Sequence, residues 1–547
     1  MLDALVVGAG PTGLVMAAEL ARQGLRCRLV DRLESPSLLS RALVVQARTL
    51  EVFDDFGIAE QALARGRRVE SFNITAPGGV RMKLSLQAFS ALETRYPYML
   101  MLPQDATEAL LTERLAGLGL WVERGLGLED FRQDAEGVEV TLKRADGGVE
   151  TVRARWLLGC DGARSRVRKV AGIPFEGETY DDTCVLADVH VEWPLEPGGL
   201  YLTPSTHGVL AAFPMPGEAR YRLVAIIPRD GREETAPVSL EEMQGLVDRM
   251  APVPVRLSDA RWLSRYRLHR GGVPRYRQGR VFLAGDAAHI HSPAGGQGMN
   301  TGIQDAYNLA WKLALVTRGR APEALLDTYE LERHRVGQKL LEGTDKLFGI
   351  MARGGLPSRL LRAYVAPRFA KWIFSRPAVQ HRMIRFVSEL FIHYRQSPLS
   401  TDAVAGEDVG GLKLTQGPAP GERVPDVPAQ AEGVERLYDV LRGPHHTLLL
   451  FAGMMGGGGA SEALEALARR LEQGYGPDLL KVRVVALQGT PGPSLLVDAR
   501  GDLHYRFGAG AACLYLVRPD GYVGFRARPI DVQRLEAELA TRLGTPS

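Results

Sequence analysis

The first 31 residues carry the pattern that most restricts how this chain can fold. A β-forming run at residues 2–7 leads into the glycine turn GAGPTG at residues 8–13, and a helical pattern follows. A second β-forming run, residues 27–30, ends at Asp31. Strand, glycine turn, helix, strand and acid in this order predict a Rossmann-like unit that binds a dinucleotide. The glycines let the backbone approach a pyrophosphate, and the helix start offers N–H groups to that anion.

The acid that ends the second strand is placed to accept hydrogen bonds from an adenosine ribose. This unit alone does not separate FAD from NAD as the dinucleotide. Its candidate cofactor-binding residues are Gly8, Gly10, Pro11, Thr12, Gly13, Asp31 and Arg32.

Two later motifs favour FAD. Residues 156–168, WLLGCDGARSRVR, run from an apolar strand through Asp161 into a basic helix start. Residues 280–300, RVFLAGDAAHIHSPAGGQGMN, run from a buried strand through Asp286 and a glycine-rich turn into a long helix. Asp286 would accept hydrogen bonds from polyol hydroxyls, and a helix N-terminus stabilises the negative charge of a reduced flavin.

The order and spacing of these three motifs resemble the class A flavoprotein monooxygenases, the aromatic hydroxylase superfamily. The resemblance covers almost the whole chain and is most specific in AGDAAHIHSPAGGQGMNTGIQDAYNLAWKLA, residues 284–314. It extends to polyketide hydroxylases, rifampicin monooxygenases and the phenol hydroxylase branch. The resemblance implies an α/β fold with three parts: a glutathione-reductase-type, Rossmann-like FAD-binding domain, an interleaved β-sheet substrate domain and a C-terminal thioredoxin-like domain.

The activity implied by the resemblance is FAD-dependent hydroxylation of an aromatic or polyketide-type small molecule. The substrates would include O2 and NAD(P)H, with NADPH favoured, and the oxygen would pass through a flavin C4a-hydroperoxide. The resemblance also implies cofactor contacts outside the first unit. These are Arg41, Gln104, Leu128, Asp161, Asp286, Pro293, Gly296, Gly298, Met299 and Asn300.

The resemblance also identifies the segment that begins at Ser40-Arg41-Ala42 as the loop beside the flavin, the flavin loop. Phenol hydroxylases carry an acid shortly after the alanine of this loop, where this chain has Leu43. This departure favours a larger substrate than a simple phenol. Tyr201, His207 and Tyr221 are candidates for a base that activates the substrate, but each is better interpreted as a pocket wall or core residue, so the catalytic residues stay unassigned.

Domain boundaries follow from the motifs and from composition. We expect residues 1–70, 100–175 and 275–350 to form the FAD-binding domain, and residues 71–99 and 176–274 to form the substrate sheet. Residues 351–400 read as a helical segment, and the Gly- and Pro-rich residues 401–430 as a linker. Residues 431–547 would form the thioredoxin-like domain, which without a CxxC pair cannot run dithiol chemistry.

Composition limits which other classes of function are to be expected. The 67 basic and 64 acidic residues almost balance, which gives no reason to expect binding to nucleic acid or to a membrane. The four cysteines are scattered, and no apolar run is long enough for a membrane span. We therefore expect a cytoplasmic protein, with no secretion signal and either monomeric or homodimeric. His289 and His291 are close in sequence but lie inside the flavin motif, so no metal site is predicted.

Three alternatives remain open at this point. The same flavin chemistry on a ketone would give a Baeyer–Villiger oxidation, and on an antibiotic from outside the cell it would give inactivation, as in rifampicin monooxygenases. A flavin-binding protein without enzymatic activity is the non-enzyme alternative, and it predicts no substrate-dependent consumption of NAD(P)H.

Overall fold

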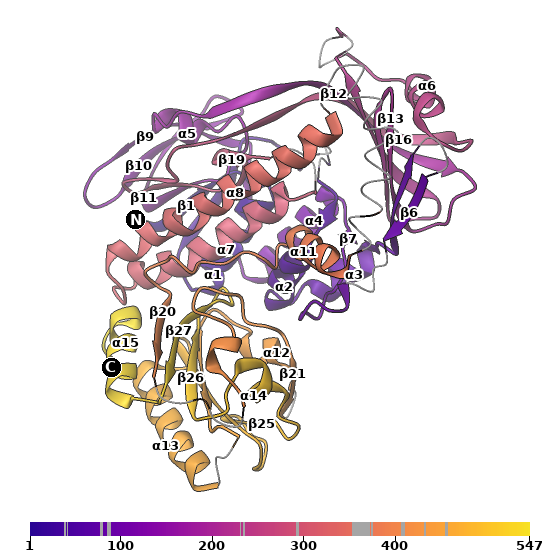
Figure 1. Ribbon diagram of the computed structural model, residues 1–547. Helices are drawn as coiled ribbons and strands as arrows, with labels where there is room; N and C mark the ends of the chain where they lie inside the picture. The colour runs from indigo at the N-terminus through magenta and orange to yellow at the C-terminus, as the bar shows by residue number, and fades with distance from the viewer. Residues whose placement is uncertain are drawn as a thin grey trace.

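A computed structural model of the chain describes residues 1–37, 40, 42–76, 80–84, 89–229, 231–232, 236–291, 295–352, 372, 376–405, 408, 411–431, 434–454 and 458–546. Three sheets with covering helices make up the molecule, and a separate lower lobe holds the C-terminal part of the chain (Figure 1). Two small sheets complete it, one of β3 (Val44–Val45), β7 (Leu100–Met101) and β4 (Arg67–Arg68), the other of β21 (Pro428–Ala431) and β22 (Val434–Arg436).

The first sheet contains the predicted dinucleotide unit. Its core is parallel, in the order β18-β11-β1-β2-β8, and β1 is buried because strands lie on both sides and helices cover it. The strands are β1 (Leu2–Val7), β2 (Cys27–Asp31), β8 (Val122–Arg124), β9 (Leu126–Gln133), β10 (Val138–Arg144), β11 (Val149–Gly159), β17 (Arg277–Gln278) and β18 (Val281–Leu283).

Helices surround this sheet and bring distant parts of the chain together. Helix α1 packs against both α4 and α7, so the first and third motifs become neighbours. The helices of this region are α1 (Pro11–Arg22), α2 (Ala47–Asp55), α3 (Ala59–Arg65), α4 (Gln104–Gly117), α5 (Arg166–Val170), η2 (Gly285–Ala287), α7 (Gly298–Thr317), η3 (Glu323–Leu326) and α8 (Asp327–Ala352).

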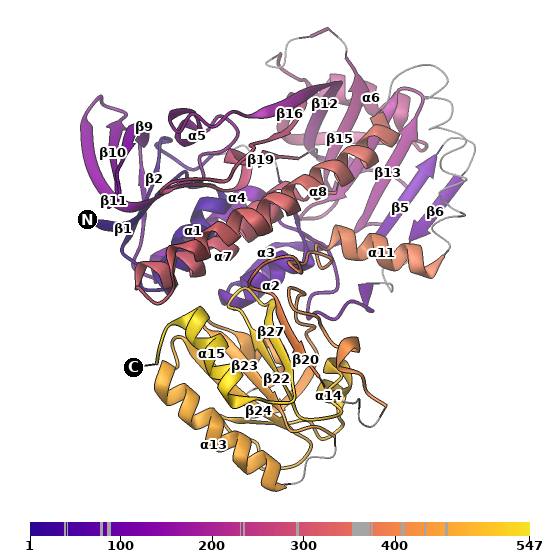
Figure 2. The same cartoon turned by 60° about the vertical axis from the view of Figure 1, so that its left-hand side comes forward.

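The second sheet is mostly antiparallel and stands beside the first, reached by the long strands β12 and β16 (Figure 2). Its order is β19-β16-β12-β15-β14-β13-β5-β6, so residues 71–84 join strands that follow more than 90 residues later. Helix α6 (Leu240–Met250) covers one face. The strands are β5 (Ser71–Ala76), β6 (Val80–Leu84), β12 (Glu176–Glu192), β13 (Gly199–Ser205), β14 (Gly208–Pro214), β15 (Arg220–Pro228), β16 (Arg256–Gly272) and β19 (His289–Ile290).

The C-terminal domain has a six-stranded sheet in the order β20-β27-β26-β23-β24-β25. Its strands are β20 (Thr401–Val404), β23 (His446–Phe451), β24 (Leu480–Ala486), β25 (Leu495–Val497), β26 (Cys513–Val517) and β27 (Val523–Arg528). Helices α11 (Pro377–Val387), η5 (Leu414–Gln416), α12 (Leu437–Leu441), α13 (Gly458–Tyr475), α14 (Asp502–Phe507) and α15 (Val532–Leu543) complete the chain.

Strand β20 differs from the prediction of a linker over residues 401–430. Residues 401–404 pair in parallel with residues 525–528 of β27 and form an edge of the C-terminal sheet. A short edge strand needs few apolar residues, which is why its composition resembles a linker. Much of the predicted helical segment, residues 353–371 and 373–375, lies outside the described residues.

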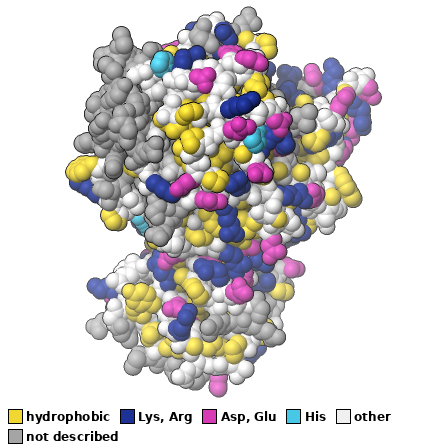
Figure 3. Space-filling model, turned by 90° about the vertical axis from the view of Figure 1, so that its right-hand side faces the viewer, with side chains coloured by type: hydrophobic (Ala, Val, Ile, Leu, Met, Phe, Trp, Pro, Cys, Tyr) yellow, Lys and Arg dark blue, Asp and Glu magenta, His cyan; other side chains and the backbone are white. Residues whose placement is uncertain are grey.

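The lobes meet at a waist where basic and acidic side chains gather on the face shown in Figure 3. Arg442 of the C-terminal domain pairs with Asp54 of α2 at 2.9 Å, and Arg95 pairs with Asp439 of α12 at 2.8 Å. Apolar contact continues beneath these pairs, because Trp311 and Leu315 of α7 belong to the core of the C-terminal domain.

Candidate active site

The first glycine turn is shaped by close packing. Gly8 has φ +102°, and a Cβ there would lie 2.4 Å from the carbonyl oxygen of Cys160. A Cβ on Gly13 would lie 1.8 Å from the Gly8 carbonyl oxygen. Gly10, by contrast, faces open space, next to the start of α1 with Pro11 as its first residue. Space in front of a helix N-terminus fits a pyrophosphate, so this turn fits the cofactor that the sequence predicts.

The acid at the end of β2 is held by the same turn. One carboxylate oxygen of Asp31 accepts from the N–H of Ala9 at 2.6 Å, and the other accepts from the N–H of Leu33 at 2.8 Å. Arg32 is exposed beside it, and a Cβ on Gly127 of β9 would lie 3.1 Å from the Arg32 Cβ. Leu128 follows on β9 and is buried. These residues therefore lie together at the end of β2.

The motif at residues 280–300 packs against the first glycine turn through the side chain of Thr12. A Cβ on Gly285, which has φ +59°, would lie 2.5 Å from Oγ1 of Thr12, and a Cβ on Gly302 would lie 2.4 Å from the same atom. The Thr12 side chain thus fills a slot between η2 and α7 that only glycines leave open. Asp286 follows in η2 and is exposed, as a ligand of a polyol chain has to be.

The carboxylate of Asp161 serves the protein itself. It accepts from Oγ of Ser165 at 2.5 Å and from the N–H groups of Arg166 at 2.6 Å and Val167 at 3.1 Å, which satisfies the first turn of α5. Burial holds the pKa of Asp161 above its usual value, although these hydrogen bonds act in the opposite direction. Its Cα would lie 2.7 Å from a Cβ on Gly8, so the backbone of the second motif lies against the first turn.

Gln104, the first residue of α4, fixes the flavin loop. Its Oε1 accepts from the N–H of Ala42 at 3.1 Å, its Nε2 donates to Glu108 at 2.8 Å, and its N–H donates to Ser40 Oγ at 2.9 Å. Leu43 is buried. The predicted contact Arg41 lies outside the described residues.

The start of α7 is joined to the same loop by Asn300. Its Oδ1 accepts from the N–H of Gln46 at 2.9 Å, and its Nδ2 donates to the carbonyl oxygens of Val44 at 2.9 Å and Gly296 at 2.8 Å. The Asn300 side chain is therefore used within the protein, and the backbone is what the helix start can offer to a flavin. Gly298 faces open space and Met299 is half-buried, whereas Pro293 lies outside the described residues.

An apolar cluster lies where the flavin loop meets the second sheet. Its members come from the loop, from strands β5, β13 and β14, and from α11. They include Leu43, Val44, Phe72, Leu200, Phe213, Met215, Ile384 and Val387. Such walls suit a largely apolar ligand. The sequence did not reveal this cluster, because its members are scattered over more than 340 residues.

Comparison with known proteins identifies the family. Residues 1–344 match the family model described as an FAD binding domain, and residues 417–546 match the one described as the C-terminal part of aromatic-ring hydroxylases. The chain belongs to the FAD-dependent aromatic hydroxylases, the class A flavin monooxygenases. It is 37% identical to 6-methylpretetramide 4-monooxygenase of Streptomyces rimosus, and the match covers 98% of this chain and 92% of that protein.

Solved structures of similar proteins have the same fold as this aromatic hydroxylase. An anhydrotetracycline hydroxylase from Streptomyces rimosus matches all of both chains with 32% identity and a TM-score of 0.75. Aklavinone-11 hydroxylase, solved with FAD and aklavinone, matches 99% of both chains with 27% identity and a TM-score of 0.75. The prediction of the fold class and of an FAD-dependent monooxygenase is confirmed.

Two of the three candidate bases lie on the face of the substrate sheet that α6 covers, in agreement with their interpretation as core residues. Tyr201 donates to the carbonyl oxygen of Glu196 at 2.7 Å, and both Tyr201 and Tyr221 pack against Trp193 in the cluster under α6. Burial raises the pKa of Tyr201 to about 12. His207 lies in the β13–β14 turn beside Thr206. Tyr201 and Tyr221 are therefore core residues of this hydroxylase.

Arg222 is a candidate for the site that the sequence did not reveal. It follows Tyr221 in β15, so strand alternation turns it to the opposite face, which is the signal that could have revealed it. Its guanidinium pairs with Asp188 at 2.7 and 2.8 Å, lies 5.1 Å from the ring centre of Trp262, and reaches the Ala42 carbonyl oxygen of the flavin loop at 3.4 Å. The substrate sheet thus contacts the flavin loop through a buried cation.

His289 and His291 of the third motif have structural surroundings. The ring of His289 is 2.6 Å from Asp305, and burial together with His289 holds the pKa of His291 well below its usual value. Within the described residues, no group of three or more acidic, histidine or cysteine side chains has the arrangement of a metal site. In the same part of the chain, no helix is long and apolar enough to cross a membrane.

Proposed function

We propose that this hydroxylase adds a hydroxyl group to a polycyclic aromatic polyketide, using NADPH and O2. One oxygen atom would enter a carbon–hydrogen bond, the other would leave as water, and NADPH would be oxidised. The observation that carries the proposal is the apolar cluster between the flavin loop and the substrate sheet, whose side chains suit the wall of a site for a largely apolar ligand. Full-length similarity to enzymes that act on 6-methylpretetramide and aklavinone supports it.

The protein's part in this chemistry is to hold FAD, to orient the substrate against it and to keep water away from the reacting atoms. Bound FAD supplies the acceptance of hydride and the activation of oxygen. The glycine turn before α1 and residues Asp31 and Asp286 would hold its nucleotide and polyol parts, and the start of α7 would stabilise negative charge on the ring. Phe213, Met215 and the buried loop residues would exclude water from the reacting atoms.

Arg222 is the buried cation nearest to the flavin loop in the contacts described above. We infer that it favours the ionised form of a substrate phenol, because a nearby positive charge lowers the pKa of an acid. Electron density on the ring rises with ionisation, which promotes attack by an electrophilic oxygen. Asp188 keeps the guanidinium in place.

NADPH rather than NADH, a cytoplasmic location, and a monomer or homodimer belong to the same proposal. All four cysteines are buried as free thiols, which fits a reducing compartment.

The test starts from the colour and absorption spectrum of the purified protein, which should show bound FAD. NADPH consumption should then rise with tetracyclic and angular polyphenols more than with simple phenols, and labelled O2 should place one heavy oxygen in a new phenol. A lactone as product would replace hydroxylation with Baeyer–Villiger oxidation. Consumption of NADPH that no aromatic compound stimulates would overturn the proposal.

A Gly10→Val variant is the negative control, since a Cβ there meets no protein atom within 4 Å and its side chain would occupy the space that the pyrophosphate needs. It should purify without FAD and show no NADPH consumption above background.

A further inference from the structure

Two adjacent residues of α8, Glu332 and Arg333, are buried charges that face different partners. Both side chains are 1% exposed or less. Burying charges is costly unless they are paired and fully hydrogen-bonded, so such a pair requires an explanation. The reaction described above uses neither residue.

Arg333 faces the flavin motif. Its Nε donates to Oδ1 of Asp305 at 2.7 Å, its Nη2 donates to the carbonyl oxygen of Thr301 at 3.0 Å, and its Nη1 donates to the hydroxyl of Tyr394 at 3.0 Å. The guanidinium therefore joins α8 to two positions of α7 and to the segment that follows α11.

Asp305 in turn holds the turn that carries Asp286. Its Oδ2 accepts from the N–H of Gly285 at 3.0 Å and is 2.6 Å from Nε2 of His289. Burial alone would raise the pKa of Asp305, but His289 and Arg333 lower it to about 2. A carboxylate that stays ionised at neutral pH is thus fixed from one side by Arg333 and fixes η2 from the other.

Glu332 faces the C-terminal domain. It accepts from Arg518 at 2.7 and 2.9 Å and from Lys312 of α7 at 2.8 Å. Arg518 also donates to Asp520 at 2.9 and 2.5 Å, and Asp520 accepts from Asn308 of α7 at 3.0 Å. One arginine of the C-terminal domain therefore anchors α8 and, through its partner aspartate, α7.

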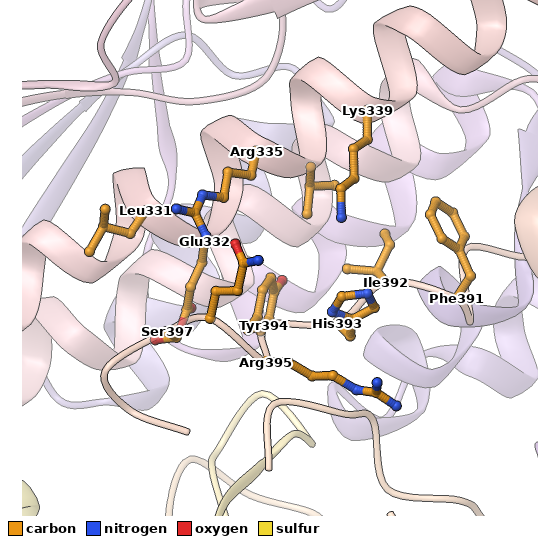
Figure 4. Close-up of a pocket in the computed structure, with 12 residues that line it drawn as sticks. Leu331, Glu332, Arg335, Lys339, Phe391, Ile392, His393, Tyr394, Arg395 and Ser397 are labelled. Carbon is orange, nitrogen blue, oxygen red and sulfur yellow. Dashed lines mark hydrogen bonds between the residues drawn. The ribbon is translucent and has the colours of Figure 1, made fainter. Parts of the chain in front are cut away.

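Aromatic rings close the gap between the two charged groups. Tyr394, the partner of Arg333, lies 4.4 Å from the ring of Tyr522 in the C-terminal domain, and the Arg518 guanidinium lies 5.2 Å from the Tyr394 ring. Figure 4 shows Tyr394 against α8 beside Glu332, at the floor of the pocket between this helix and residues 391–397.

We propose that Arg333 and Arg518 are positioning residues for FAD, with the C-terminal domain holding the Gly285–Asp286 turn in place through Glu332, Arg333 and Asp305. The domain then acts as a brace for the cofactor site rather than as a redox or binding module. The inference rests on FAD binding and not on the identity of the substrate.

The experiment compares Arg333→Lys, Arg518→Lys and a matched control, Arg526→Lys. Each keeps the positive charge but loses the several directed hydrogen bonds of a guanidinium. Arg526 is also buried, with 3% of its side chain exposed, and pairs with Asp402 inside the C-terminal domain, away from α7 and α8. Two readouts are measured on the full chain freed of FAD: the affinity for added FAD, from flavin fluorescence, and hydrogen exchange in residues 283–290.

We expect Arg333→Lys to weaken FAD binding at least tenfold and Arg518→Lys to weaken it about threefold, each with faster exchange in residues 283–290. Arg526→Lys should lower the Tm but leave both readouts at wild-type values. If Arg333→Lys does not fold, the FAD affinity and hydrogen exchange of Arg518→Lys alone decide whether the inference holds.

The inference is overturned if Arg333→Lys and Arg518→Lys both fold and both keep the wild-type affinity for FAD and the wild-type hydrogen exchange in residues 283–290. Should the wild-type chain fail to take up FAD at all, the proposed function fails, while the exchange comparison still tests whether these arginines hold the turn.

Discussion

The FAD-binding domain meets its two neighbours in different ways. Towards the C-terminal domain it buries paired charges, including Arg518 with Glu332, over an apolar floor that contains Trp311. Towards the substrate sheet it meets an apolar cluster in which Phe213 and Met215, on the sheet side, stay partly exposed, and Arg222 of the sheet donates a hydrogen bond of 3.4 Å to the flavin loop. Directed hydrogen bonds fix one geometry, whereas apolar side chains accept several. We therefore expect the first junction to stay closed and the second to be the one that admits a ligand.

The largest expected effect comes from breaking the charged junction. Arg518→Met leaves Glu332 and Asp520 buried with fewer partners, which costs about 3–5 kcal/mol of the free energy of unfolding. Chemical denaturation of the FAD-loaded enzyme measures this loss. A cost below about 1 kcal/mol would show that the junction is not held by these pairs, and the contrast between the two junctions would disappear.

The next prediction concerns the pH dependence of stability at Glu389, which follows α11 and contacts α7. Burial raises its pKa to about 8, and Gln304 and Thr301 are its hydrogen-bonding partners. The folded state then keeps a proton that the unfolded state releases above its ordinary pKa near 4.5, so stability is lost as the pH rises from about 5 to 8. Glu389→Gln carries no titrating proton and should avoid this loss, which we expect to reach about 4 kcal/mol at pH 8.

Thermal unfolding of both proteins from pH 5 to pH 8 checks this sign. The gap in Tm should open in favour of the variant as the pH rises, and a gap that stays constant with pH would contradict a protonated Glu389.

The smallest effect is expected at the apolar junction. Phe213→Ala shortens a partly exposed side chain of the apolar cluster that we propose as the substrate wall, and should raise the KM for the aromatic substrate about tenfold, or about 1.4 kcal/mol, with a kcat within about twofold of wild type. FAD affinity should not change, since Phe213 lies in the sheet and not in the flavin turns. Steady-state kinetics with the best substrate of the panel measures this, and a loss of FAD instead would show that the two junctions are not separate.

The parts of the fold that could be predicted from the sequence are those in which neighbours in sequence are neighbours in space. The run from β1 through α1 to β2 is one such part, because the turn at residues 8–13 and the acid at Asp31 lie within one supersecondary unit. The helix after Gly298 is another, and β23, α13 and β24 of the C-terminal domain follow the same rule.

What escaped prediction depends on partners far along the chain. Asp305 reads as one more polar residue of a helix until Arg333 and Gly285 are placed beside it. Strand β20 has no local signal because β27, its partner, lies some 120 residues later. Strand alternation in β15, had it been applied, would have placed Tyr221 and Arg222 on opposite faces of the sheet and added Arg222 to the candidates.

The order of strands in the first sheet has a consequence for biosynthesis. β1 pairs with β11, β11 pairs with β18, and α1 packs against α7, which ends at residue 317. At about 5–20 residues per second, a ribosome needs roughly 15–60 s to deliver the last of these elements after the first. During that interval β1 and β2 can pair with each other and pack against α1 and α4, but the side of the unit that α7 covers stays open until translation passes residue 317.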